Sequence, residues 1–125
     1  MPPLKYPKDA TRYAPDPRSR PIAQSITDGG YVYVRDANGV VHVAPDGPHM
    51  HPKVLGNGQP AMYAGDMTVR GGKVVDVTNL SGTFEFDDEA GLREVAAEIR
   101  RQGLVVEVGA VRFFPADGSR PVVLE

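Results

Sequence analysis

The side chains best suited to acid–base chemistry are histidines near the middle of the chain. His49 and His51 form a His-x-His pair in a loop, and His42 lies on a predicted strand. An imidazole titrates near neutral pH and can act as a general acid or base. We assign that role to His51 and interpret His49 as a solvent-exposed loop residue. Because His51 precedes a proline and no ligand trio is evident, we predict no metal site, and the sequence points to no particular cofactor.

Asp66 is the second candidate, and its role depends on which face of its strand is buried. If its own face is buried, the carboxylate lies near a core and needs a partner or a raised pKa. If the opposite, mostly apolar face is buried, Asp66 is simply solvated. The pattern leaves both open, because the second arrangement would put Asp76 on the core side. In the functional interpretation, Asp66 is catalytic and orients His51 or carries charge.

A short polar segment follows the central strands. Asn79, Ser81 and Thr83 supply an amide and two hydroxyls beside the flexible Gly82. Such a set can hold a substrate or direct donors at a developing oxyanion. It can equally form a turn closed by bonds from side chains to the backbone. In the functional interpretation Ser81 is catalytic, and Asn79, Thr83 and Tyr63 bind the substrate.

A central hairpin would position these side chains. Two apolar-rich runs, Asp66–Arg70 and Lys73–Thr78, flank Gly71-Gly72. A Gly-Gly pair suits the positive φ angles of a two-residue turn. The predicted pairs are Val69 with Val74, Thr68 with Val75 and Asp66 with Val77.

The alternation of side chains along strands places three candidates together. In that register Asp66, Asn79 and Ser81 share one face of the hairpin. The loop of residues 45–60, which carries His51, leads into the same hairpin. We therefore predict that these four side chains meet in one cleft beside the loop.

An earlier hairpin is predicted over Tyr31–Ala44, around the turn residues Asp36-Ala37-Asn38-Gly39. A loop of these four residues would pair Val34 with Val41 and Val32 with Val43, which gives an apolar face. The opposite face would carry Tyr31, Tyr33, Arg35, Val40 and His42. The loop of residues 45–60 holds four prolines and three glycines, so only a short strand at Lys53–Leu55 is predicted there.

One amphipathic helix is predicted over Asp87–Gln102. Asp87 can cap its N-terminus, and Gly103 suits its C-terminal end. Its apolar stripe, which must pack on the sheet, is Leu92, Val95, Ala96 and Ile99. After the helix we predict a long strand at Leu104–Phe114 and a short edge strand at Pro121–Leu124.

Residues 1–30 differ from the rest of the chain because they hold half of its 12 prolines. Proline removes a backbone donor and disfavours helix at the preceding residue. We predict an extended arm that tethers a single domain of residues 31–125 and contributes little to its stability. The arm would be docked through Tyr6, Tyr13 and Ile22, or disordered; the alternative is a binding arm.

The composition limits the class of protein. A chain of 125 residues with 41% hydrophobic and 24% charged residues is typical of one soluble globular domain. Its net charge of −2 indicates no general nucleic-acid affinity but leaves room for a local basic patch. The absence of cysteine excludes disulfides, thiolate metal sites and a cysteine nucleophile. Neither a membrane span nor a secretory signal is evident, so we expect a cytoplasmic protein or one delivered within a larger protein.

Four short motifs follow one another along the chain. They are His51-Pro52-x-x-Leu55-Gly56, Ala64-Gly65-Asp66, Gly71-Gly72-Lys73-Val74 and Asn79-x-Ser81-Gly82-Thr83-Phe84. Their types and order resemble a module at the C-termini of bacterial polymorphic toxins, and the resemblance covers about residues 31–105. That module often has histidine and tyrosine after the Ser-Gly, where this chain has Thr83 and Phe84. A catalytic histidine at that position would be missing here.

The resemblance implies a delivered effector domain and a functional role for His51, Asp66, Asn79 and Ser81. The expected fold is α+β, a mainly antiparallel twisted sheet of about five or six strands with one helix on one face. The expected function is that of a bacterial toxin C-terminal domain with a small catalytic site, whose substrate would be RNA or a nucleotide such as NAD. The alternative is a non-catalytic protein-binding module, such as an immunity or docking domain, that uses its basic arm and the face carrying Tyr31. In either case the partner would be a cognate immunity or carrier protein.

Overall fold

The computed structural model describes residues 4–8 and 11–125, and it confirms the α+β class. Within these residues seven strands form one sheet, accompanied by two helices, where about five or six strands and one helix were predicted. In chain order the elements are β1 (Arg20–Pro21), β2 (Gly29–Arg35), β3 (Val41–Pro45), α1 (His51–Leu55), β4 (Tyr63–Arg70), β5 (Lys73–Thr78), α2 (Glu89–Arg101), β6 (Val111–Phe113) and β7 (Val122–Val123).

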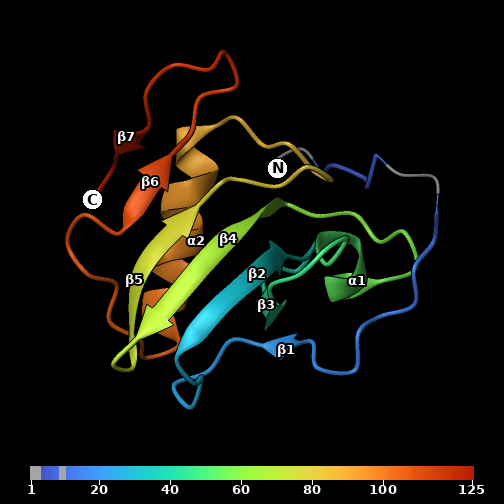
Figure 1. Ribbon diagram of the computed structural model, residues 1–125, viewed down its shortest axis with the longest axis horizontal. Coiled ribbons are helices and arrows are strands. Elements are labelled where there is room, and N and C mark those ends of the chain that lie inside the picture. Colours follow the sequence, from blue (N-terminus) through green and yellow to red (C-terminus); the bar gives the residue numbers. More distant parts are fainter. Residues whose placement is uncertain (1–3, 9–10) are drawn as a thin grey trace.

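The sheet has the strand order β1-β3-β2-β4-β5-β6-β7. All neighbouring strands are antiparallel except β5 and β6, which are parallel. A parallel pair needs a crossover connection, and α2 supplies it. Figure 1 shows α2 behind β4 and β5, whereas α1 lies at the other end of the sheet, where it contacts β2 and β3.

A β-bulge interrupts the central hairpin. The Gly71-Gly72 turn forms as predicted, with φ angles of 62° and 74°, and Val69 pairs with Val74. Beyond that pair the register shifts by one residue, which leaves Val75 as the extra residue on β5. The observed pairs Thr68 with Asp76 and Met67 with Val77 replace the predicted pairs Thr68 with Val75 and Asp66 with Val77.

The bulge decides which face each side chain of the hairpin takes. The core face carries Met67, Val69, Val74 and Val77, which are at most 1% exposed. Asp66 and Asp76 both turn to the other face, where they are partly exposed. Asn79 lies on the core side and is 5% exposed. The prediction that Asp66 and Asn79 share a face is therefore wrong, because the extra residue reverses the alternation between them.

The first hairpin has a loop one residue longer than predicted. Arg35 pairs with Val41, so the predicted pairing of Val34 with Val41 is wrong. The loop is closed by Asp36, whose Oδ1 accepts the backbone N–H groups of Asn38 at 2.9 Å and Val40 at 3.0 Å. This aspartate-centred turn is a common alternative to a backbone turn.

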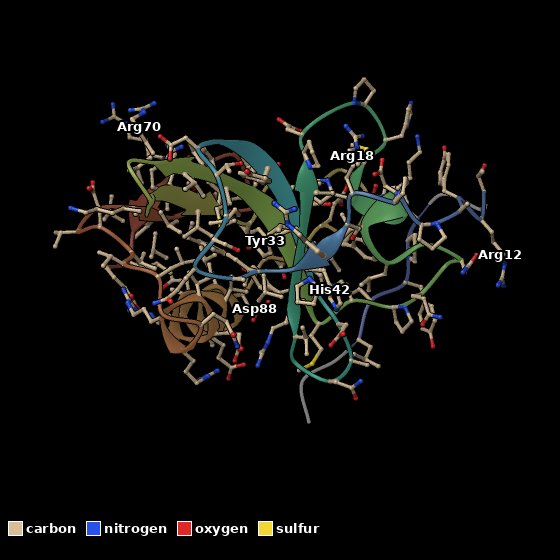
Figure 2. All side chains as sticks on the ribbon, turned by 90° about the horizontal axis from the view of Figure 1, so that it is seen from below. Arg12, Arg18, Tyr33, His42, Arg70 and Asp88 are labelled. Carbon is tan, nitrogen blue, oxygen red and sulfur yellow. The ribbon has the colours of Figure 1, made fainter. Side chains whose placement is uncertain are left out.

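Strand β2 is buried on both faces. Tyr31 is 7% exposed and Tyr33 is not exposed at all, and the Tyr33 hydroxyl donates to the Thr78 carbonyl at 2.6 Å. Figure 2 shows Tyr33 inside the molecule, whereas Arg12, Arg18 and Arg70 lie at its periphery. The tyrosine face predicted as a partner surface is thus part of the core.

The main helix agrees closely with the predicted pattern. Leu92, Val95, Ala96 and Ile99 are all fully buried, as the stripe predicts. The cap is Asp88 rather than Asp87, because Gly91 N–H donates to Asp88 Oδ2 at 2.8 Å. Gly103 follows the helix with a φ of 89°, as expected for a C-terminal stop.

Two strand predictions fail for local reasons. The segment Lys53–Leu55 belongs to α1, because Pro52 occupies its first turn, where proline's missing N–H is not needed. Within Leu104–Phe114 only Val111–Phe113 is a named strand, because the chain turns at Gly109 with a φ of 84°. The short edge strand near the C-terminus is present as β7.

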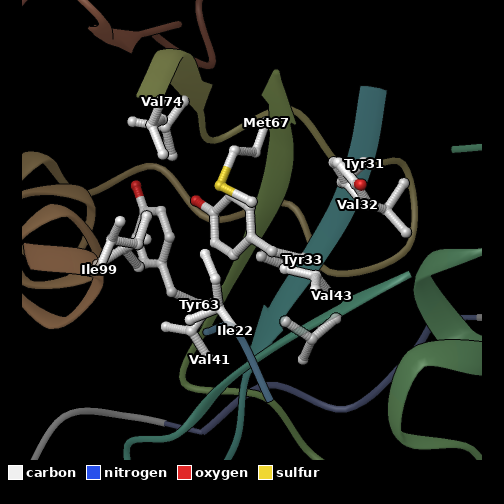
Figure 3. Packing of buried hydrophobic residues seen from close by; sticks show 14 of the residues in the cluster. Ile22, Tyr31, Val32, Tyr33, Val41, Val43, Tyr63, Met67, Val74 and Ile99 are labelled. Atoms are coloured by element: carbon white, nitrogen blue, oxygen red, sulfur yellow. The ribbon is translucent and has the colours of Figure 1, made fainter. Parts of the chain in front are cut away.

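The predicted arm is joined to the sheet. β1 pairs with β3, and Ile22 and Ile26 are 4% and 6% exposed. Figure 3 shows Ile22 among the core side chains, beside Val41. Tyr6, by contrast, is 67% exposed, so the docking through Tyr6 is wrong and that through Ile22 is confirmed.

Candidate functional site

Helix α1 places His51 against the backbone of strand β4. His51 is its first residue, and the buried side chains of Met50 and Val54 anchor the helix from either side. Its Nε2 atom lies 2.8 Å from the carbonyl oxygen of Gly65. A carbonyl can only accept a hydrogen bond, so Nε2 carries the proton. In the neutral ring the lone pair is therefore on Nδ1.

The Nδ1 atom of His51 is not completely buried, although the ring is largely covered. The His51 side chain is 12% exposed. Nδ1 has no hydrogen-bond partner among the described residues, and it is not one of their fully buried unpaired polar atoms. The basic nitrogen of the ring is thus unpaired among the described residues and not completely buried.

Asp66 approaches the Nε2 atom of the ring. Its Oδ1 atom is 3.8 Å from His51 Nε2, beyond hydrogen-bond distance, and its side chain is 44% exposed. Burial raises the pKa of Asp66 to about 6, with the negative charges of Asp46 and Asp76 adding to the effect. Burial also lowers the pKa of His51, against the opposing effects of Gly65 and Asp46.

These directions describe two neighbouring groups that both favour their neutral forms. An ion pair would lower the pKa of Asp66 and raise that of His51, so the 3.8 Å approach is not a formed salt bridge. At pH 7 the pair consists of a neutral imidazole and a carboxylate. A positive charge created on His51 would then be stabilised by Asp66.

A cavity of about 520 Å³ adjoins the ring. It is lined by Lys8, Gly47, His49, Met50, His51, Gly82 and Thr83. The backbone N–H of Lys8 donates to the Thr83 carbonyl at 3.1 Å, which ties the N-terminal segment to the wall. His49 has a φ of 57°, unusual for a residue other than glycine, and its ring stacks on Tyr13 with centroids 6.3 Å apart.

The structure therefore places two other predicted site residues near His51: Asp66, 3.8 Å from its Nε2, and Thr83, in the same cavity wall. Asn79 is not among them. Its Nδ2 donates to the carbonyls of Phe86 at 2.9 Å and Phe114 at 3.0 Å, and its Oδ1 accepts the Phe114 N–H at 2.7 Å. The amide is occupied by the backbone, away from the cavity.

Ser81 and Tyr63 also lie outside the cavity wall. Ser81 Oγ accepts the N–H groups of Thr83 and Phe84, both at 3.3 Å, which is the turn that the sequence left open as an alternative. Tyr63 is 1% exposed, and its hydroxyl donates to the Asp88 carbonyl at 2.7 Å, beneath α2. The prediction that Asn79 and Ser81 meet His51 in one cleft is thus wrong.

Three contributors escaped prediction from the sequence. Lys8 belongs to the proline-rich segment, and no local pattern connects it with Thr83. Asp46 acts only through its charge on His51 and Asp66. His49 had a signal in the His-x-His spacing, but the spacing does not show that its ring faces the same cavity as His51.

A second imidazole–carboxylate pair lies at the loop of the first hairpin. His42 Nε2 is 2.8 Å from Asp36 Oδ2, and both residues line a cavity of about 260 Å³. Although burial opposes it, hydrogen bonds from His42, Val40 and Asn38 lower the pKa of Asp36. Asp36 Oδ1 closes the loop and its Oδ2 bonds His42, so both oxygens are engaged within the fold and the pair has a structural role.

Within residues 4–8 and 11–125, no three His, Asp or Glu side chains are placed to bind one metal ion, and no helix is long and apolar enough to cross a membrane. No family model matches the chain, and no curated protein or solved structure is similar to it. The functional argument therefore depends on the geometry around His51.

Proposed function

We propose that this chain is an effector domain with an acid–base site in which His51 is the proton-transfer group. The observation that carries the proposal is the orientation of its ring. Nε2–H is held by the Gly65 carbonyl, Nδ1 is unpaired among the described residues and not completely buried, and His51 lines the cavity. A neutral imidazole fixed in one tautomer, with its basic nitrogen unpaired, is the arrangement that a general base needs.

In the proposed reaction Nδ1 accepts a proton from a bound hydroxyl group or water. The resulting imidazolium is stabilised by the carboxylate of Asp66, 3.8 Å from Nε2. The proton is then returned from Nδ1 to the leaving group. Positioned proton transfer of this kind contributes roughly 10²–10⁴-fold to a rate. Thr83 and Lys8, in the same cavity wall, hold the substrate.

The motif order along residues 31–105 supports the effector assignment, and it favours substrates that such domains meet in a bacterial cell. RNA or a nucleotide such as NAD are the candidates. The site residues His51, Asp66 and Thr83 occupy motif positions. Two other motif residues, Asn79 and Ser81, instead shape the chain around the site.

The test is growth of bacteria that express the chain with and without His51→Gln. Glutamine can still donate to the Gly65 carbonyl but cannot transfer a proton, so the fold is kept and the chemistry is lost. The wild-type chain should arrest growth and His51→Gln should not. His42→Gln is the matched control and should arrest growth like the wild type. Normal growth with the wild-type chain, or arrest by both variants alike, would contradict the proposal.

A second candidate function is that of a non-catalytic docking module for a cognate immunity or carrier protein. It is favoured by exposed valines at the β6–β7 end of the sheet. Val108 is fully exposed, and Val105, Val122 and Val123 are 56%, 43% and 58% exposed. If this function holds, Val108→Asp should abolish copurification with the protein encoded beside this chain, and His51→Gln should leave it intact. The reverse pattern would reject it.

A further inference from the structure

Three side chains that can donate hydrogen bonds line the cavity beside His51. They are Lys8, His49 and Thr83, whereas His51 donates its own N–H to the Gly65 carbonyl. Among the residues that the structure describes, no Asp or Glu belongs to this lining. Side chains that donate hydrogen bonds, with no carboxylate among them, form an environment suited to an anion.

Three carboxylates lie near the cavity, those of Glu85, Asp66 and Asp46, and none of them belongs to its lining. Glu85 forms an ion pair with Lys8, but both side chains are more than half exposed, at 56% and 58%. An exposed pair of this kind is weak, and an anionic ligand can replace it. Asp66 Oδ1 lies 3.8 Å from His51 Nε2, and Asp46 acts on the His51 ring through its charge.

We infer that this cavity binds the phosphate group of a nucleotide or of RNA. The inference deepens the proposed function and rests on it. A phosphate has several charged oxygens, which can accept from an ammonium, a hydroxyl and an imidazole at the same time, whereas a carboxylate has two. The volume of about 520 Å³ lies within the roughly 300–1,000 Å³ of small-molecule sites, so it has room for more than the phosphate alone.

An aromatic and cationic surface continues beyond His49. The Tyr13 ring stacks on His49 with an interplanar angle of 20°, and Lys53 Nζ lies 5.4 Å from the centre of the Tyr13 ring. Bases stack on aromatic rings, and lysine attracts further phosphates. This surface favours a nucleotide or RNA over inorganic phosphate as the natural ligand.

The test is a titration of the full chain followed by amide chemical shifts. The probes are inorganic phosphate, 5′-AMP, a short oligoribonucleotide and, as the carboxylate control, acetate. The three phosphate-bearing probes should shift the amides of His49, His51 and Thr83 in a saturable manner, and acetate should not. Tighter binding of 5′-AMP than of the oligoribonucleotide would identify a free nucleotide as the ligand, and the opposite order would identify RNA.

Lys8→Gln should weaken phosphate binding about tenfold or more, as expected for the loss of a charge-assisted hydrogen bond. The matched control is Lys73→Gln, at the exposed turn between β4 and β5, which should leave binding unchanged. Equal weakening by both variants, equal shifts with acetate, or no saturation at millimolar phosphate would overturn the inference. Growth arrest that depends on His51 without phosphate binding would reject the ligand but keep the acid–base site. Phosphate binding without growth arrest would keep the anion site and reject the effector function.

Discussion

At the scale of single residues, the environment of Asp66 is unfavourable for its charge. Burial and two neighbouring carboxylates raise its pKa to about 6, and no cation among the described residues neutralises it. Such a group costs stability when it is ionised, and proteins keep such groups mainly where chemistry needs them. The position beside His51 gives that cost a functional reason.

Replacing Asp66 with asparagine should stabilise the fold above pH 7. The folded state holds the Asp66 proton up to about pH 6, whereas the unfolded chain releases it near the ordinary pKa of 3.8. Folding therefore binds a proton between these values, and stability falls as the pH rises through that window. Because the side chain is 44% exposed, solvent screening reduces the gain to about 1 kcal/mol.

Urea unfolding of Asp66→Asn and the wild type at pH 3 and pH 8 measures this difference. We expect the two chains to be equally stable at pH 3 and the variant to be more stable at pH 8. A variant less stable at pH 8 would mean that Asp66 is held by a favourable partner and that its ionised form is structural.

At the scale of elements, Asn79 joins the segments that follow β5, precede α2 and follow β6 by hydrogen bonds. It follows β5, and its amide bonds the backbone after β6 at Phe114 and before α2 at Phe86. This replaces backbone pairing at the point where the parallel strands end. From the sequence Asn79 is a candidate for substrate binding. Residue type alone does not distinguish an asparagine that joins loops from one that binds a ligand.

Asn79→Ala should lower the free energy of unfolding by about 2–4 kcal/mol, because it leaves three backbone groups without their partner. Ser81→Ala, which loses weaker bonds of 3.3 Å, should cost about 1 kcal/mol or less. Chemical denaturation measures both values. An Asn79→Ala chain as stable as the wild type, yet unable to arrest growth, would return Asn79 to the active site.

At the scale of the whole molecule, the N-terminal segment is part of the fold. β1 extends the sheet beside β3, Ile22 enters the core, and Lys8 reaches the cavity wall. The same segment thus closes both the core and the proposed site. The expectation that it contributes little to stability does not fit this arrangement.

Ile22→Ala should therefore destabilise the protein by about 2–4 kcal/mol, as for other buried isoleucines. Tyr6→Ala is the control from the same segment, and because Tyr6 is 67% exposed its cost should be about 0.5 kcal/mol or less. Thermal melts of the two variants test the difference. Equal and small effects would restore the interpretation of the segment as a tether.

Local periodicity predicted the parts of the fold that depend on neighbouring residues. The stripe ending at Ile99 and the pair Val69–Val74 are examples. Prediction from local periodicity failed where one extra residue shifts the strand register. The bulge at Val75 lies in a run of β-branched residues with no glycine or proline to mark it, and it separated Asp66 from Asn79. A single sequence carries no such signal.

Contacts between distant segments were equally out of reach. The hydrogen bond from Lys8 to Thr83 and that from His51 to Gly65 join residues far apart in the chain. His51 itself was predicted as a site residue from the chemistry of its imidazole, because a histidine in a glycine- and proline-rich loop is seldom needed for packing. Its hydrogen bond to the Gly65 carbonyl is visible only in the structure, because every residue has a backbone carbonyl and the sequence does not indicate which one is used.

The most direct test of the account is the tautomer and pKa of His51, read from the ¹⁵N shifts of its ring across a pH titration. We predict a protonated Nε2 and an unprotonated Nδ1 at pH 7, and a pKa of His51 below the ordinary 6.5. In the Asp66→Asn variant the pKa should fall further, because the carboxylate that favours the imidazolium is lost. A proton on Nδ1 at pH 7, or a pKa above 6.5 that is unchanged in Asp66→Asn, would contradict the central claim that His51 is a poised base.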